Sequence, residues 1–318
     1  MASETVLVAG STGLVGRAAV QALVKRGHTV RALVRRPEAA QQFHGPGLSA
    51  VVGDLSGGGD WGAAMESVTA IVDATQVRMA GRLTVRNARH GAEGRRRMVA
   101  FLLSNVRNQS TSLRSYVALS GLEDYAATGD AWFDESAPPA SETFGYSHLS
   151  VQSRALLSEA QREWGLPLVM LRMGLIYGTS GWFPEFAIRI RRGRGVLVGP
   201  GTNYSSLVCS DDVGEAIRAA VEAAPRGEEF LVVDDEPMVQ STWQASLAAS
   251  LGQPTVRRRV PFWLASLMVG RVNAETFTSS RRARNLRAKD RLGLTLAFPT
   301  IRQGFPAALA AAGLLNPR

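Results

Sequence analysis

Cysteine and lysine are scarce in this 318-residue sequence, and both shortages exclude something. Cys209 is the only cysteine, so the chain cannot form an internal disulfide. The histidines show no metal-ligand spacing with cysteine or carboxylates, which argues against a metal site; they are His28, His44, His90 and His148. Lys25 and Lys289 are the only lysines, so any task that needs a lysine elsewhere must be done by another residue type.

Long apolar runs are missing as well. The longest run near the C-terminus, VPFWLASLMVG, is too short to span a bilayer. The first residues, MASETVLVAG, lead directly into an apolar strand without the charged region or cleavage site of a secretion signal. We therefore expect a cytoplasmic protein that has no membrane partner.

The composition otherwise fits a soluble globular protein, with 45% hydrophobic residues. The length suits one large α/β unit, or a nucleotide-binding domain with a smaller lobe. The formal charge of +9 raises the question of nucleic acid or an acidic ligand. Because the basic residues are spread along the chain without a nucleic-acid-binding motif, we favour a solvated arginine-rich surface and expect no nucleic-acid partner.

Short β-branched runs alternate with helical spacing through the first half of the chain. A helix is predicted at 13–26 between the first two strands. Predicted strands lie at 5–10, 28–34, 48–54, 69–75, 115–120, 167–172 and 229–234. This alternation predicts an α/β fold with a doubly wound parallel sheet of the Rossmann type.

The pattern changes after Gly178, where glycine-rich and aromatic segments precede helical stretches near 240–251 and 261–269. We expect residues 1–175 to form the nucleotide-binding domain, which the strand near 229–234 rejoins. Residues 176–318 should mainly build a smaller substrate-binding lobe over the carboxyl ends of the strands.

A glycine-rich turn joins the first strand to the first helix. Gly10, Gly13 and Gly16 have GxxGxxG spacing in the sequence GSTGLVG. Gly10 permits a tight turn, Gly13 lets the backbone approach a pyrophosphate, and Gly16 allows close helix packing. A glycine-rich turn without a ligand is the alternative, but the strand before it and the helix after it favour dinucleotide binding.

The residues after the second strand predict which dinucleotide binds. Arg35 and Arg36 stand where an NAD site would have a carboxylate for the ribose 2′-hydroxyl. Paired arginines suit a 2′-phosphate, so we predict NADP(H); an exposed surface pair is the alternative. Asp54, after the third strand, is a candidate partner of the adenine amino group or a plain turn residue.

These features together resemble the extended and atypical short-chain dehydrogenase/reductases, which include NAD(P)-dependent epimerases and dehydratases. The resemblance covers nearly the whole chain through VAGSTGLVG, GDL, YVALSG, YSHLS, LRMGLIYG, VCSDDVGEAI and LGLTLAFPTIRQGF, and YAATGDAWFDESAPP is similar to atypical epimerase-like members. The expected cofactor-binding residues are Gly10, Ser11, Thr12, Gly13, Leu14, Val15, Gly16, Arg35, Arg36, Asp54, Leu55, Ala74, Thr75 and Tyr146.

The resemblance also implies catalytic residues. In the family a serine or threonine and a tyrosine bind the substrate carbonyl, and a lysine four residues after the tyrosine binds the nicotinamide ribose and lowers the tyrosine pKa. The matching positions here are Ser120 and Tyr146, but Ser150 replaces the lysine. Arg154 and Arg172 are candidates for the missing positive charge, although each has an equally good structural explanation.

Two further residues are candidates for proton transfer. Asp73 ends the fourth predicted strand near the expected nicotinamide position, and Tyr125 follows Ser120 at a spacing seen in extended members. A capped strand-end carboxylate and a loop aromatic are the simpler interpretations of these two residues. His148 should point away from the face of Tyr146.

Three functions remain open on this basis. The first is an NADP(H)-dependent oxidoreductase or epimerase-like enzyme that acts on a small-molecule carbonyl substrate. The second is a non-redox cyclase, dehydratase or isomerase with NADP as a scaffold, and the third is a non-catalytic NADP sensor. The sequence GWFPEF (181–186) suggests an apolar cover for an aromatic or polyketide-like substrate, or simply lobe packing. The basic stretch 76–97, expected to be a loop, either meets an acidic substrate or forms solvent-facing surface, and the sequence does not indicate an oligomeric state.

Overall fold

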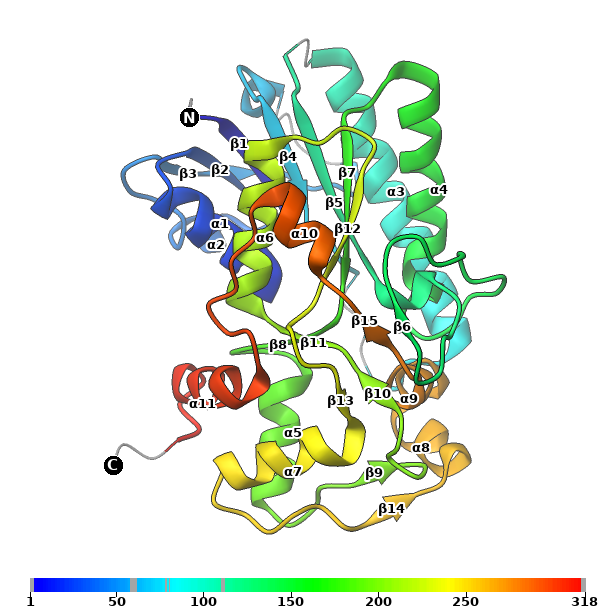
Figure 1. The fold of residues 1–318 in the computed structure, drawn as a ribbon. Coiled ribbons are helices and arrows are strands. Elements are labelled where there is room, and N and C mark those ends of the chain that lie inside the picture. The colour runs from blue at the N-terminus through cyan, green and yellow to red at the C-terminus, as the bar shows by residue number, and fades with distance from the viewer. Residues whose placement is uncertain (1–2, 58–61, 78, 80, 110–111, 316–318) are drawn as a thin grey trace.

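A parallel sheet of seven strands forms the centre of the protein (Figure 1). The structure is a computed structural model that describes residues 3–57, 62–77, 79, 81–109 and 112–315. The strands are β1 (Thr5–Ala9), β2 (Thr29–Val34), β3 (Leu48–Val52), β4 (Ala70–Asp73), β5 (Ser115–Gly121), β7 (Leu168–Met173) and β12 (Glu229–Val232). Their order across the sheet is β12-β7-β5-β4-β1-β2-β3, and every neighbouring pair is parallel.

Alternating side chains divide the core into two layers, one on each face of the sheet. In β1, Val6 and Val8 point into one layer and Leu7 and Ala9 into the other, as the two-residue period of a strand requires. The first layer is covered by α1 (Leu14–Lys25), α6 (Ser210–Ala223) and α10 (Leu286–Leu292). The second is covered by α3 (Val85–Gln109) and α4 (Ser147–Trp164). The predicted doubly wound Rossmann-type fold is therefore confirmed.

A separate aromatic-rich core lies below the carboxyl ends of the strands, in the lower half of Figure 1. Its helices are α5 (Trp182–Arg191), α7 (Gln240–Ser250) and α11 (Ile301–Ala311), and α8 (Phe262–Val269) and α9 (Arg271–Thr278) lie beside it. Short strands are β6 (Trp132–Phe133), β8 (Leu175–Tyr177), β9 (Leu197–Val198), β10 (Tyr204–Ser205), β11 (Leu207–Cys209), β13 (Met238–Val239), β14 (Arg259–Val260) and β15 (Arg282–Ala283). They form four two-stranded pairs, β8 with β11, β9 with β14, β10 with β13 and β6 with β15.

The segments that form the sheet with its helices and the segments that form the lobe alternate along the chain. β12, from residues after the lobe begins, pairs with β7 at the edge of the main sheet, and α6 and α10 pack on the same sheet. A short helix, α2 (Pro37–Ala40), follows β2, and 3-10 turns lie at Gly62–Met65 and Leu122–Asp124. None of the helices in the described residues is long and apolar enough to cross a membrane.

The stretch 76–97 corrects one expectation. Its second part is not a loop, because α3 begins at Val85 and continues to Gln109. The arginines from Arg86 onward therefore belong to a helix that packs against α4 and the sheet, and one of them, Arg95, is buried. The apolar periodicity of this helix is hard to recognise in the sequence because many of its residues are charged.

Candidate active site

A cavity of about 370 Å³ lies at the carboxyl ends of the strands, between the sheet and the lobe. The glycine turn and the start of α1 form one end of its wall. The other end is formed by the ends of β4, β5 and β7, the first turns of α4, and lobe segments 204–206 and 276–281. This is where open parallel sheets bind their ligands, because the loops there diverge to opposite sides of the sheet.

The glycine turn is shaped by two positions that exclude a side chain. A Cβ at Gly10, which has φ of 80°, would lie 2.4 Å from the carbonyl oxygen of Ala74. A Cβ at Gly16 would lie 2.1 Å from the carbonyl oxygen of Gly10. At Gly13, the N-terminal flanking residue of α1, the nearest such atom would be 3.4 Å away. The turn thus packs tightly on its inner side, while the helix N-terminus remains available to an anion.

The predicted cofactor residues divide into two groups. Those that line the cavity are Gly13, Leu14, Val15, Gly16, Ala74, Thr75 and Tyr146. Those outside its lining are Gly10, Ser11, Thr12, Arg35, Arg36, Asp54 and Leu55. The buried Ser11 hydroxyl donates to the Leu33 carbonyl at 2.8 Å, which holds the turn against β2. Leu55 is buried in the apolar layer behind the sheet.

The region after β2 carries the predicted phosphate pair. Arg35 and Arg36 are both exposed, and Arg36 precedes α2. The Ser56 backbone N–H donates to Asp54 at 2.9 Å and lowers the pKa of that carboxyl, with a smaller contribution from Arg35. Arg35 and Arg36 are therefore long cationic side chains at the end of β2 that remain exposed to solvent.

Ser120 and Tyr146 both line the cavity, as the resemblance implied. Tyr146 directly precedes α4, and its hydroxyl donates to Asn273 Oδ1 at 2.9 Å. Burial, with a smaller contribution from Glu123, raises the pKa of Tyr146 to about 12. A tyrosine in this environment is a hydrogen-bond donor and a weak acid, because burial and the nearby Glu123 disfavour its phenolate.

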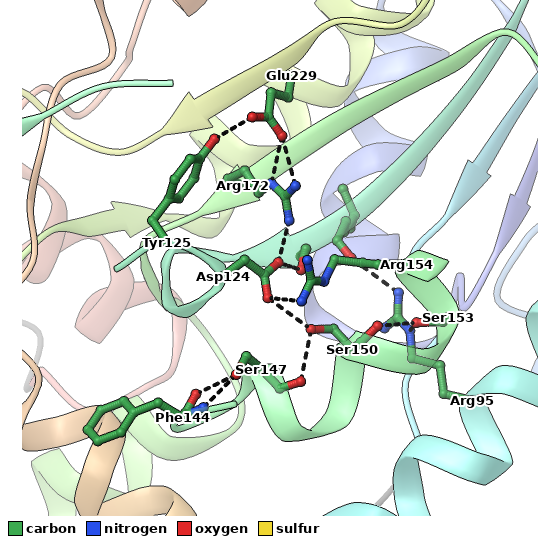
Figure 2. Close-up of polar contacts among 12 residues, drawn as sticks. Arg95, Asp124, Tyr125, Phe144, Ser147, Ser150, Ser153, Arg154, Arg172 and Glu229 are labelled. Carbon is green, nitrogen blue, oxygen red and sulfur yellow. Dashed lines mark hydrogen bonds and ion pairs between the residues drawn. The ribbon is translucent and has the colours of Figure 1, made fainter. Parts of the chain in front are cut away.

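The lysine position is occupied by a serine in a network of charged side chains (Figure 2). Ser150 is 8% exposed, lines the cavity, and donates to Asp124 Oδ1 at 3.3 Å. Ser120 also donates to Asp124, at the other carboxylate oxygen. The same carboxylate pairs with Arg154, at 2.9 Å, and with Arg172. Asp124 is therefore the centre of the network, and it draws the hydroxyls of both serines toward itself.

The two arginines considered as substitutes for the lysine are used within this network. Arg172 also pairs with Glu229, whose carboxylate oxygen lies 2.8 Å from Nη2. Neither Arg154 nor Arg172 lines the cavity. Two carboxylates, Asp124 and Glu229, thus face two guanidinium groups, and we correct the expectation that either arginine supplies free positive charge to the ligand.

Asp73 and Tyr125 lie outside the cavity lining, contrary to the placement expected from sequence. Asp73 is fully buried and accepts hydrogen bonds from the Thr75 N–H at 3.1 Å and from the Thr75 hydroxyl. It caps the end of β4, which is the simpler interpretation noted above. The hydroxyl of Tyr125 donates to Glu229 at 2.7 Å, and burial, reinforced by Glu229, raises the pKa of that tyrosine.

Arg95 brings a cation to the cavity from α3. It is 6% exposed and lines the cavity. Its guanidinium donates to the carbonyls of Thr75 and Leu119, at 2.6 and 3.1 Å, and to the Ser153 hydroxyl, at 3.1 Å. No carboxylate forms an ion pair with it among the described residues. Its positive charge is therefore solvated by neutral acceptors and remains uncompensated.

Glu123 is a second buried charge-bearing residue in the wall. It is 9% exposed and lines the cavity beside Tyr146. Burial raises the pKa of Glu123, and the nearby Asp124 raises it further, while Arg281 acts in the opposite direction. A carboxyl in this setting can hold a proton at a pH where an exposed glutamate has lost it.

Sequence reasoning did not identify Arg95, Glu123, Asp124 or Arg281 as site residues. Arg95 belongs to the run GRRR and Arg281 to SSRRAR, so neither stands out in an arginine-rich chain. The signal for Glu123 and Asp124 was their position just after Ser120, at the end of a strand that delivers residues to the site. No comparable signal marks Asn273, which reaches Tyr146 from α9.

The aromatic segment GWFPEF forms the start of α5, and only one of its aromatic side chains lines the cavity. Trp182 lines the cavity, and its indole N–H donates to the Ile176 carbonyl at 2.7 Å. Phe183 is fully buried in the lobe core, and Phe186 packs beside Trp243.

His148 lies 3.7 Å from Glu275 and does not line the cavity, as expected. No group of residues suited to a metal ion occurs in the described part of the chain.

Comparison with known protein families agrees with this architecture. Residues 6–233 match the model of the NAD dependent epimerase/dehydratase family. The chain is 31% identical over 314 residues to a 3-diazoavenalumate denitrifying reductase of a Streptomyces species, which covers 94% of this chain and 98% of the relative. It is 27% identical over 266 residues to a 4-hydroxy-2-methyl-3-oxo-4-farnesyl-3,4-dihydroquinoline-1-oxide ketoreductase of Stigmatella aurantiaca, covering 81% of this chain and 76% of the relative.

Solved structures share the fold at lower sequence identity. A human epimerase family protein with NADPH has a TM-score of 0.78 and 21% identity, covering 98% of this chain and all of the other. UDP-glucuronic acid 4-epimerase from Bacillus cereus, in complex with UDP-glucuronic acid and NAD, has a TM-score of 0.79 and 14% identity, covering 97% of this chain and 99% of the other. At these identities the likeness establishes the fold.

Proposed function

The chain belongs to the NAD dependent epimerase/dehydratase family, and on that premise we propose that it is an NADP(H)-dependent reductase of a small, apolar carbonyl substrate. One observation carries the proposal: a single cavity connects the glycine turn with Ser120 and Tyr146. A dinucleotide held at the turn would extend toward these two hydroxyls. The Stigmatella aurantiaca relative, named as a ketoreductase, supports reduction of a carbonyl, and the Streptomyces relative, named as a denitrifying reductase, supports a reductase more generally.

The residues of the turn fit a dinucleotide. Gly10 and Gly16 keep the backbone close to its neighbours, and Gly13 leaves the N-terminus of α1 open, so its N–H groups can bind a pyrophosphate. Arg35 and Arg36 would hold a 2′-phosphate. The NADPH-bound human neighbour is consistent with this choice, although the Bacillus cereus neighbour has NAD. When bound, NADPH would supply the hydride.

The nicotinamide half would be held without the family lysine. Arg95 lines the cavity next to Thr75 and carries an uncompensated positive charge. We assign to it the task of binding the ribose of that half. Arg95 comes from α3 and the lysine of relatives comes from the helix of the tyrosine, so the cation approaches the site from another direction. The influences on the pKa of Tyr146 are burial and Glu123, and both raise it.

Orientation of the substrate and delivery of the proton would then be tasks of different residues. Ser120 and Tyr146 would orient a substrate oxygen by hydrogen bonding, since Tyr146 keeps its proton to about pH 12. Glu123 is the better candidate acid, because the ordinary pKa of a carboxyl is far below that of a phenol and burial raises the pKa of Glu123. Glu123 is thus the proposed proton donor, with Tyr146 as the positioning donor.

The substrate end of the cavity is apolar. Leu122, Leu149, Leu175, Ile176 and Trp182 contribute to the wall there. These side chains favour a substrate with an aromatic or polyketide-like body. The name of the Stigmatella aurantiaca relative, which includes a farnesyl dihydroquinoline oxide, is in keeping with a bulky apolar substrate.

Purified protein with NADPH and a panel of aromatic and aliphatic ketones tests the proposal. Consumption of NADPH in step with formation of the alcohol is expected. Glu123→Gln should lower kcat more than it raises KM, because the proton is needed in the chemical step. Failure of NADPH to bind would overturn the proposal, and so would binding without turnover of any ketone in the panel.

A non-redox reaction is the second candidate, and the high pKa of Tyr146 favours it. An isomerase, cyclase or dehydratase would use Glu123 as acid and base while NADP remained bound as a scaffold. Product formation with no change in NADPH absorbance would identify this reaction. A sensor without chemistry would show neither product nor NADPH consumption.

A further inference from the structure

Arg281 is a buried cation in the lobe wall of the cavity whose hydrogen-bonding capacity is largely unused. It is 6% exposed and belongs to the segment between α9 and β15. A guanidinium has five N–H donors. The guanidinium of Arg281 makes two hydrogen bonds, each of 3.3 Å, to the carbonyls of Ser280 and Tyr125. Its Nε has no partner among the described residues.

The contrast with Arg95 shows why this is unusual. Both arginines are 6% exposed and both line the same cavity. Arg95 donates to several acceptors at 2.6–3.1 Å, and these tie together β4, β5 and α4. The guanidinium of Arg281 makes no hydrogen bond shorter than 3.3 Å. Burying a guanidinium without strong acceptors is costly, so the position is better explained by an acceptor that a ligand provides.

A second unsatisfied group lies on the same segment. Ser279 is 9% exposed and lines the cavity, and its hydroxyl has no hydrogen-bond partner among the described residues. Its backbone is fixed, since its N–H donates to Glu275 at 2.9 Å and its carbonyl accepts from Asn203 at 3.2 Å. A cationic donor and a neutral hydroxyl two residues away are therefore both available to one acceptor.

Glu123 does not neutralise Arg281. No ion pair links Arg281 to a carboxylate of the described residues, although the charge of Glu123 opposes the fall in the Arg281 pKa that burial causes. Burial also raises the pKa of Glu123, which favours its neutral form. The guanidinium of Arg281 therefore has no carboxylate partner among the described residues and can pair with one from a ligand.

We propose that Arg281 and Ser279 form a subsite for a carboxylate on the substrate. The inference rests on the proposed function and names its substrate class: an apolar carbonyl compound that also bears a carboxylate. One guanidinium and one hydroxyl match a single negative charge, and the apolar wall with Trp182 accommodates the rest of the molecule.

The test compares acids with their uncharged amides in the presence of saturating NADPH. Benzoate, cinnamate and octanoate, each with its primary amide, are titrated by calorimetry. At least one acid should bind about tenfold or more tightly than its amide, since a charge-assisted hydrogen bond is involved. Arg281→Gln should abolish the preference and Arg281→Lys should restore part of it.

Arg284→Gln is the matched control, because Arg284 is an exposed arginine just after β15 that does not line the cavity. It should retain the full preference. Ser279→Ala provides an independent measure if Arg281→Gln does not fold, and it should reduce the preference severalfold while amide binding is unchanged. Glu123→Gln should leave acid binding intact or strengthen it.

The outcomes separate this inference from the proposed function. If NADPH binds but every acid binds no better than its amide, the carboxylate subsite is wrong while the reductase proposal stands. The same conclusion follows if no acid binds at all, or if Arg281→Gln keeps the preference. If the parent protein does not bind NADPH, the proposed function itself is wrong.

Discussion

At the glycine turn the cleft is shaped by backbone, whereas around Ser150 it is shaped by side chains from several elements. The turn depends on two close approaches, Gly10 to Ala74 and Gly16 to Gly10, which any larger residue would block. The network at Ser150 depends on Asp124, which binds two serines and two arginines. A backbone contact of this kind allows only glycine. A charged network can be rearranged when one of its members is substituted, because another charged residue can take the place of the lost partner. The sequence at the two ends of the cleft can therefore change independently.

The largest expected effect tests the side-chain region. Asp124→Ala leaves Arg154 and Arg172 without the carboxylate between them and should reduce the free energy of unfolding by about 3–5 kcal/mol. Urea denaturation measures the change. Asp130→Ala removes an exposed carboxylate from the following loop and should change stability by less than about 0.5 kcal/mol. Equal stability of the two variants would show that the network contributes little.

The second prediction tests the backbone region. Gly16→Ala places a Cβ against a main-chain oxygen that cannot move aside and should destabilise the protein by about 3 kcal/mol. Gly13→Ala meets only an ordinary contact, so its stability should stay within about 1 kcal/mol of the parent. Thermal denaturation of the two variants measures the difference. A stable Gly16→Ala would contradict the close approach.

The third prediction addresses the cation that replaces the lysine. Arg95→Met should weaken NADPH binding about 10-fold to 100-fold and leave binding of 2′,5′-ADP unchanged, because the latter lacks the nicotinamide ribose. Arg97→Met, an exposed arginine two residues along α3, serves as the control. Fluorescence titration gives both affinities. An equal loss for the two ligands would mean that Arg95 only supports the fold.

A smaller effect is expected at the adenosine end. The double variant Arg35→Ala with Arg36→Ala should remove a preference of at least about tenfold for NADPH over NADH, since both side chains are exposed at the end of β2. Titration of parent and variant with both cofactors measures it. Equal affinities in the parent would refute the assignment of NADP.

The smallest effect concerns the tyrosine. Ser150→Lys should lower the pKa of Tyr146 by about one pH unit, because an ammonium one helical turn away favours the phenolate. Ultraviolet titration detects it, and Tyr146→Phe identifies which transition belongs to this residue. An unchanged pKa would indicate that Asp124 captures the new cation, and would sharpen the contrast between this site and lysine-bearing relatives.

The fold followed closely from local patterns. Each of the seven strands of the sheet coincides with an apolar run that the sequence marked, and α1 begins next to the predicted glycine turn. α3 was missed in part because its arginines hide the apolar stripe that packs on the sheet. Among the site residues, Ser120 and Tyr146 were placed in the cavity wall as expected, but Asp73 and Tyr125 face other partners.

Local sequence determined the glycine turn, the strands around it and the loss of the lysine, because these depend on steric limits and on short-range spacing. Tertiary structure decided which charges face the ligand. Arg95, Arg154, Arg172 and Arg281 are the same residue type in an arginine-rich chain, yet two are paired with carboxylates and two line the cavity without one. That distinction arises only when α3, the turn at Leu122–Asp124 and the segment after α9 meet, since the cost of burying a charge depends on partners distant in sequence.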